Sequence, residues 1–158
     1  MKKLPKTPSF RLDGKKALVT GGSRGIGLGC SVALAEAGAH VIIVARSRTQ
    51  IEDAAKAICD AGLKAEGFVL DVMQLHSVKS FFAEHGPFNV VVNSAGIARH
   101  ASSYETTVED YDAVTSVNMR SAYFLAQEAA LGMKAIGGGS IVQISSQMGH
   151  VGGQDRAV

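Results

Sequence analysis

The sequence has few cysteines, little net charge and no long apolar run. Its two cysteines, Cys30 and Cys59, form no Cys-x-x-Cys pair, which argues against a disulfide framework and favours buried free thiols. The five histidines lack the spacing of metal ligands, so we expect no metal site. No stretch of about 18 apolar residues occurs, so neither a membrane-spanning helix nor a membrane partner is predicted.

Charge is nearly balanced, with sixteen basic and fourteen acidic residues and a formal net charge of +2. Several of the basic residues precede position 17, so the rest of the chain is close to neutral. We therefore expect no nucleic-acid partner, because binding would need a basic face on the domain itself. Residues 1–13 are interpreted as a basic, mobile N-terminal arm, and no apolar segment follows that would make it a secretory signal. A cytoplasmic location is expected.

Glycine is abundant, at 18 of 158 residues, or about 11% against a usual ~7%. Short apolar runs that predict buried strands alternate with helical patterns, and several glycines end the helices. The predicted strands cover residues 16–20, 40–45, 65–70, 88–93 and 140–145. Helices are predicted within 25–37, 51–61, 75–82 and 107–135. This alternation predicts an α/β fold, with a parallel sheet covered by helices on both faces.

The sharpest local signal is Thr20-Gly-Gly-Ser-Arg-Gly-Ile-Gly27, between the first predicted strand and the first predicted helix. Glycines there permit a tight turn and a close approach of the backbone to a ligand. The helix N-terminus that follows offers free N–H groups and the positive end of a dipole to a phosphate. The spacing is neither that of a P-loop nor the common G-x-G-x-x-G. A glycine-rich turn without a ligand is the alternative interpretation.

This loop and four further motifs, in the same order along the chain, resemble the short-chain dehydrogenase/reductase family. The further motifs are Asp71-Val72 after the third strand, Asn93-Ser-Ala-Gly96 after the fourth, Asn118 in Ser-Val-Asn-Met, and Ile144-Ser-Ser146 after the fifth. The resemblance covers nearly the whole chain from Phe10 onward. It implies a Rossmann-like, doubly wound parallel sheet over residues 14–158, truncated after about five strands, with the C-terminal part of the family's domain absent.

The resemblance also implies a dinucleotide cofactor and a set of residues that hold it. The cofactor-binding residues carried over to this chain are Thr20, Gly21, Ser23, Arg24, Gly25, Ile26, Gly27, Arg46, Asp71, Val72, Asn93, Ala95 and Gly96. Ser94 departs from the family's second asparagine, and a serine reaches less far. By resemblance, Ser146 is the catalytic serine that polarises a substrate carbonyl, and Asn118 holds a water in a proton relay. For Asn93 and Asn118 the alternative is a structural role at strand and helix ends.

The end of the second strand bears on the choice between NADP(H) and NAD(H). Enzymes that prefer NAD usually carry an acidic residue there, whereas this chain has Ala45 followed by Arg46, with Arg24 in the glycine loop. A guanidinium can pair with a 2′-phosphate through a bidentate fork. We therefore predict that NADP(H) is preferred over NAD(H). The alternative is that Arg46 is only a solvated surface charge.

The family's catalytic tyrosine has no counterpart in the sequence. In the family it follows the serine by thirteen positions, with a lysine four positions later, and counting from Ser146 gives position 159, one past Val158. None of Tyr104, Tyr111 and Tyr123 has a lysine four residues on. We therefore expect the chain to be the N-terminal portion of such an enzyme and to be nearly inactive by itself.

The predicted function is hydride transfer between NADP(H) and a small carbonyl or alcohol substrate, by an enzyme that is a homo-oligomer in its full-length form. Loops 97–103 and 147–151 are expected to line the substrate pocket. Two alternatives stay open. One is a catalytically inactive nucleotide-binding or interaction module, if the chain ends at Val158. The other is a related fold that uses the glycine loop for nucleotide-sugar chemistry.

Overall fold

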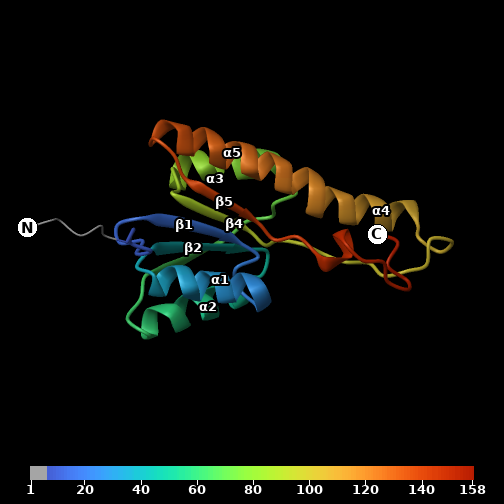
Figure 1. Cartoon of the computed structure of the whole chain (residues 1–158), viewed down its shortest axis with the longest axis horizontal. Helices are drawn as coiled ribbons and strands as arrows, with labels where there is room; N and C mark the ends of the chain where they lie inside the picture. Colours follow the sequence, from blue (N-terminus) through green and yellow to red (C-terminus); the bar gives the residue numbers. More distant parts are fainter. Residues whose placement is uncertain (1–6) are drawn as a thin grey trace, which may run out of the picture.

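The structure is a computed structural model that describes residues 7–158, and in this part of the chain five parallel strands form one sheet (Figure 1). The strands are β1 (Lys16–Thr20), β2 (His40–Ala45), β3 (Ala65–Val69), β4 (Val90–Asn93) and β5 (Ser140–Gln143). They lie in the order β3-β2-β1-β4-β5, so the chain builds outward from β1 to one edge and then crosses to the other side. This order confirms the predicted Rossmann-like, doubly wound sheet.

Helices cover both faces of the sheet. α1 (Gly25–Glu36) and α2 (Arg48–Asp60) lie against one face, and α3 (Leu75–His85) and α5 (Ala122–Ala135) lie against the other (Figure 1). Because successive side chains of a strand point to opposite faces, neighbours along β1 enter different cores. Leu18 packs in the core that includes side chains of α3 and α5, whereas Val19 packs in the core beneath α1 and α2. The continuous apolar runs of β1 and β2 therefore match strands buried on both faces.

The region predicted as one helix, 107–135, is helical throughout but changes its winding in the middle. α4 (Val108–Thr115) leads through a π-helical turn, η1 (Ser116–Ser121), directly into α5. Such turns are rare and are found mostly inside α-helices, often at functional sites. This one contains Asn118. In the described part of the chain, no helix is both long enough and apolar enough to cross a bilayer.

Three strands are shorter than the sequence predicts. β3 ends at Val69 rather than at residue 70. β4 begins at Val90 rather than at residue 88, and Phe88 is instead a buried core residue ahead of the strand. β5 ends at Gln143 rather than at residue 145, because the next backbone N–H, that of Ile144, makes the last bond to β4. The chain then turns into the short 3-10 helix η2 (Gln147–Gly149). The fifth strand motif therefore leaves the sheet just before Ser146.

Of the predicted N-terminal arm, residues 1–6 lie outside the described residues. Further along, Arg11 Nη1 donates a hydrogen bond to the Glu36 carbonyl oxygen at 2.9 Å, and Leu12 packs against the core beneath α1 and α2. Arg11 also pairs with Asp13 at 2.6 Å, and this hydrogen-bonded guanidinium lowers the pKa of the Asp13 carboxyl below its ordinary value. These contacts tie the segment before β1 to the C-terminal end of α1.

Candidate functional site

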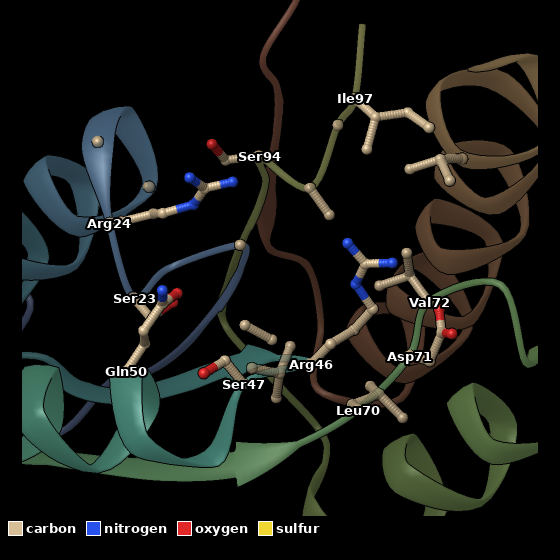
Figure 2. A pocket seen from close by; sticks show the side chains of 18 of the residues that line it. Ser23, Arg24, Arg46, Ser47, Gln50, Leu70, Asp71, Val72, Ser94 and Ile97 are labelled. Carbon is tan, nitrogen blue, oxygen red and sulfur yellow. The ribbon is translucent and has the colours of Figure 1, made fainter. Parts of the chain in front are cut away.

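The carboxyl ends of the strands open into a cavity of about 690 Å³ (Figure 2). The strand order reverses on either side of β1, which lies between β2 and β4, and doubly wound sheets bind ligands in the crevice at such a point. Loops that follow β1, β2, β3 and β4 all contribute to the cavity wall. The predicted residues that line it are Gly21, Ser23, Arg24, Gly25, Ile26, Gly27, Arg46, Asp71, Val72, Ala95 and Gly96.

The glycine loop is shaped by close packing as well as by backbone conformation. A Cβ at Gly27 would lie 2.2 Å from the Gly21 carbonyl oxygen, so any side chain there would force the start of α1 away from the loop. Gly25 has a φ of +53°, and a Cβ there would meet no atom within 4 Å, so its surroundings are open. Beneath the loop, the buried Ser31 hydroxyl lies 3.0 Å from the Gly27 carbonyl oxygen and 3.3 Å from that of Gly22. Ser31 was not predicted as a site residue.

α1 begins at the cavity without a side-chain cap. Arg24 is its N-cap residue, in an extended conformation, and makes no capping hydrogen bond, while the first turn contains no acidic residue. The first N–H groups of α1 therefore have no side-chain acceptor, and the positive end of the helix dipole lies at the cavity. A phosphate is the kind of anion that this arrangement can hold.

Two guanidinium groups line the cavity from different elements (Figure 2). Arg24 comes from the start of α1, and Arg46 comes from the loop after β2. Among residues 7–158, no carboxylate oxygen lies within 4.0 Å of either group. Arg48, by contrast, pairs with Glu52 at 3.5 Å and does not line the cavity. The two cavity arginines are therefore available to an anionic ligand.

Ser47 and Gln50 also line the cavity and are absent from the predicted set, and Gln50 lies next to Ser23 in Figure 2. Ser47 is the N-cap residue of α2, and its hydroxyl makes no capping hydrogen bond. Gln50 lies in the first turn of the same helix. The sequence did carry a signal for them, because polar residues that open the helix after the second strand lie at the same edge of the sheet as the glycine loop.

The segment after β3 forms another wall of the cavity. Leu70 and Val72 are buried apolar residues that line it, and Asp71 lies between them (Figure 2). Asp71 Oδ1 accepts a hydrogen bond from the Met73 N–H at 3.0 Å, which closes a turn. Its other carboxylate oxygen makes no hydrogen bond within residues 7–158. This wall offers apolar surface and one hydrogen-bond acceptor, a combination suited to an adenine ring.

Thr20 and Asn93 do not line the cavity but support its wall from within the sheet. The buried Thr20 hydroxyl donates to Asn93 Oδ1 at 2.7 Å and accepts hydrogen bonds from the N–H groups of Ser94, at 3.2 Å, and Ala95, at 3.1 Å. These bonds hold the backbone from which Ala95 and Gly96 face the cavity. For Asn93, these bonds correspond to the structural role at a strand end that is the alternative to cofactor binding.

The two predicted catalytic residues also lie outside the set that lines the cavity. Asn118 holds the backbone of Ile97, its Oδ1 accepting from the Ile97 N–H at 2.9 Å and its Nδ2 donating to the Ile97 carbonyl at 2.8 Å. Because Ile97 lines the cavity, Asn118 fixes one of its walls. Ser146 Oγ accepts a hydrogen bond from the Met148 N–H at 3.1 Å, which leaves its hydroxyl proton for another acceptor.

The doubly wound sheet, the cavity at its reversal point and the uncapped glycine loop define an α/β protein of the dinucleotide-binding class. A sequence profile described as short chain dehydrogenase matches residues 15–158. The chain therefore belongs to the short-chain dehydrogenase family, which confirms the resemblance carried by its motifs.

Similar proteins include dehydrogenases of sugar acids and polyols. The chain is 37% identical over 141 residues to gluconate 5-dehydrogenase of Gluconobacter oxydans (strain 621H), which covers 87% of this chain and 55% of the relative. It is 36% identical over 146 residues to D-threitol dehydrogenase of Mycolicibacterium smegmatis, covering 90% and 56%. A crystal structure of gluconate 5-dehydrogenase from Burkholderia cenocepacia J2315, in complex with NADP and tartrate, matches with a TM-score of 0.87 at 36% identity, covering 94% and 60%. The chain thus spans somewhat more than half the length of these proteins.

Proposed function

We propose that this chain carries the cofactor-binding part of an oxidoreductase that transfers hydride between NADP(H) and a carbonyl or alcohol substrate. One observation carries the proposal. Two guanidinium groups without a carboxylate partner among residues 7–158, those of Arg24 and Arg46, line the same cavity as the uncapped N-terminus of α1. This arrangement favours a ligand with phosphate groups at two separate positions.

The residues present fit a dinucleotide in size, shape and charge. The cavity of about 690 Å³ is in the ordinary range for small-molecule sites. The glycine loop leaves no room for side chains where α1 meets it but is open at Gly25, so its backbone can approach a pyrophosphate. In this proposal the loop and α1 hold the pyrophosphate, the segment around Asp71 holds the adenine, and Arg46 with Ser47 holds the 2′-phosphate.

Selectivity for NADP(H) follows from charge at the end of β2. An acidic residue at this position would accept hydrogen bonds from ribose hydroxyls and repel a 2′-phosphate. Here the strand ends at Ala45, and the next residue, Arg46, turns its guanidinium group to the cavity (Figure 2). The matched solved structure of gluconate 5-dehydrogenase holds NADP, which supports the same choice for this chain.

When bound, the cofactor donates or accepts the hydride. The chain's own contribution is to orient and polarise the substrate. In this proposal the Ser146 hydroxyl donates a hydrogen bond to the substrate oxygen and keeps its proton, since its own oxygen already accepts the Met148 N–H. Asn118 holds the cavity wall at Ile97 and, in this proposal, also keeps its place in a proton relay.

Proton transfer to the substrate needs a proton donor, which in the family is a tyrosine with a lysine four positions later. These 158 residues contain no such pair. General acid–base transfer typically contributes about 10²–10⁴ in rate. We therefore expect the chain by itself to bind the cofactor and to turn over very slowly.

The substrate in this proposal is a small hydroxylated carbonyl compound or the corresponding alcohol. The named relatives act on gluconate and D-threitol, which makes sugar acids and polyols the first compounds to test. We further propose that the full-length protein is a cytoplasmic homo-oligomer that binds neither nucleic acid nor membrane. Exposed apolar side chains on α5, including Tyr123 and Leu131, support self-association.

Two measurements on the purified chain test the proposal. Calorimetric titration with NADPH should give saturable binding, and NADPH consumption with keto-sugar acids or keto-polyols should stay about 10²-fold or more below that of an active family member. A second protein, extended at its C-terminus by a segment that contains Tyr-x-x-x-Lys, is measured in the same way. If it binds NADPH but turns over no carbonyl compound, a nucleotide-binding module without catalysis is favoured. Absence of binding for both NADPH and NADH would contradict the proposed function.

A further inference from the structure

Three polar side chains form a row across the carboxyl edge of the sheet, and the proposed function assigns no role to the outermost one, Gln143. Thr20, Asn93 and Gln143 are the last residues of β1, β4 and β5, respectively. The strand register pairs Thr20 with Asn93 and Asn93 with Gln143. Residues paired in this way point to the same face of a sheet, so the three side chains form one continuous row.

The backbone determines the direction of every hydrogen bond in this row. Thr20 Oγ1 accepts from the N–H groups of Ser94 and Ala95, which can only donate, so its single proton goes to Asn93 Oδ1 at 2.7 Å. The Asn93 amide must then turn its nitrogen away from Thr20. Nδ2 donates to Gln143 Oε1 at 2.9 Å. In the reverse orientation, Asn93 Nδ2 would face the Thr20 hydroxyl oxygen, which already accepts from the N–H groups of Ser94 and Ala95.

We propose that Gln143 is a positioning residue for the cavity wall at residues 94–97, acting through Asn93 and Thr20. Asn93 is 5% exposed, so its amide has little access to water if the Gln143 acceptor is removed. The amide can then rotate and compete with the N–H groups of Ser94 and Ala95 for the Thr20 hydroxyl oxygen. The wall that these N–H groups hold, which includes Ala95 and Gly96, loosens as a result.

Because Gln143 lies at the surface, the effect of replacing it can be distinguished from a loss of core packing. Gln143 is exposed and lies on β5, one of the two edge strands of the sheet, so its replacement opens no cavity in the core. What changes on replacement is the acceptor offered to Asn93. The inference rests on the proposed function only in naming NADPH as the ligand beside this wall.

The test compares Gln143→Met, which keeps the length of the side chain but removes the acceptor, with Gln143→Glu, which retains one. Val142→Met is the matched control, because Val142 is an exposed neighbour on the same strand that points to the other face. Hydrogen exchange at the Ser94 and Ala95 amides and the Kd for NADPH are measured for each variant. We expect Gln143→Met to raise the Ala95 exchange rate and the Kd by roughly five-fold. The Ser94 rate should rise less, because the Ser94 N–H is also shared with the Thr20 carbonyl oxygen at 3.2 Å. Gln143→Glu should restore the exchange rates and the Kd, and the control should leave them unchanged.

Two results would overturn the inference. One is unchanged exchange at the Ser94 and Ala95 amides in Gln143→Met. The other is an equal acceleration at every sheet amide, because this would show a general loss of stability rather than a local loss of position. If the unmodified protein binds neither NADPH nor NADH, the proposed function fails, but the exchange rates still decide the role of Gln143.

Discussion

The two halves of the sheet differ in how completely the protein surrounds them. β1 and β2 are buried along nearly their whole length between two layers of helices. β5, at one edge, is largely exposed, and Val142 retains 43% of its accessible surface. The loops after β1 and β2 supply much of the cavity wall, whereas after β5 only Ile144 reaches it. The glycine loop and Arg46, which follow β1 and β2, therefore rest on the most deeply buried strands of the sheet.

The difference extends to how each half holds its ligand-facing loops. On the β1–β2 side, the loop is held by contacts so close that only glycine fits, as at Gly27. On the β4–β5 side, it is held by side-chain hydrogen bonds: the Thr20 hydroxyl accepts from the Ser94 N–H, and the Asn118 amide accepts from the Ile97 N–H and donates to the Ile97 carbonyl. Packing against the backbone tolerates almost no change, whereas a hydrogen bond contributes only about 0.5–1.5 kcal/mol. Substitutions in the first half should therefore have the larger effects.

The largest effect is expected at Gly27. A valine there would place its Cβ 2.2 Å from the Gly21 carbonyl oxygen and displace the start of α1. We expect Gly27→Val to weaken NADPH binding by about 100-fold, corresponding to nearly 3 kcal/mol of overpacking. Gly29→Val is the control on the same helix, because a Cβ at Gly29 meets no atom within 4 Å. Calorimetric titration of both variants with NADPH gives the two Kd values. Equal Kd values would contradict the explanation by close packing at Gly27.

The next effect is a change of cofactor selectivity. Arg46→Asp replaces the guanidinium that lines the cavity with a carboxylate, which repels a 2′-phosphate and can accept ribose hydroxyls. We expect the Kd for NADPH to rise about 10- to 100-fold and the Kd for NADH to stay the same or fall. Arg48→Asp, at an exposed position outside the cavity, should leave the ratio unchanged. An unchanged ratio in Arg46→Asp would show that this arginine is only a surface charge.

A smaller effect is expected in the other half, at Asn118. Asn118→Leu removes both hydrogen bonds to the Ile97 backbone at an exposed site, where water can replace them in part. We expect unfolding to become easier by about 1 kcal/mol, which lowers Tm by roughly 2–4 °C. Met119→Leu, on the same π-helical turn, serves as control. A loss of about 3 kcal/mol or more in the unfolding free energy of Asn118→Leu would contradict the comparison between the halves.

The smallest effect concerns pH and the segment before β1. The pKa of Asp13 is lowered in the folded protein by its hydrogen bond with Arg11, so this pair stabilises the fold above the unfolded pKa of about 4. The contribution is lost as pH falls through the lower, folded pKa. Asp13→Asn should therefore melt slightly below the unmodified protein at pH 7, and the two should converge at strongly acidic pH. If the difference in Tm between the two proteins grew as the pH was lowered, the ionised Asp13 would not stabilise the fold through Arg11.

Local patterns in the sequence are sufficient for the sheet and for the glycine loop, whereas most other site residues were predicted by resemblance to the family. The apolar runs predict all five strands, and the spacing from Gly21 to Gly27 predicts a loop that the structure places at the cavity. The Thr20 hydroxyl, by contrast, donates a hydrogen bond to Asn93, which is 73 positions away in the sequence. No local pattern reveals such a pair, because it depends on β1 and β4 being neighbours.

The same reasoning explains the residues that were not predicted. Gln143 gains its role from its register with Asn93, and Ser31 gains its role from the side of α1 that turns toward the loop. Ser47 and Gln50 lie one and four positions after Arg46 but reach the cavity only because α2 begins at that edge of the sheet. Strand order, register and helix direction are tertiary properties. They account for most of the difference between the predicted and observed sites.

The most direct test of the central claim is the ratio of the Kd values for NADPH and NADH, measured by paired calorimetric titrations of the unmodified protein. The claim is that the cavity beside Arg24 and Arg46 holds a dinucleotide with a 2′-phosphate. We predict that NADPH binds at least about 10-fold more tightly than NADH, the value of one charge-assisted pairing with phosphate. Equal affinity for the two, or tighter binding of NADH, would contradict the account.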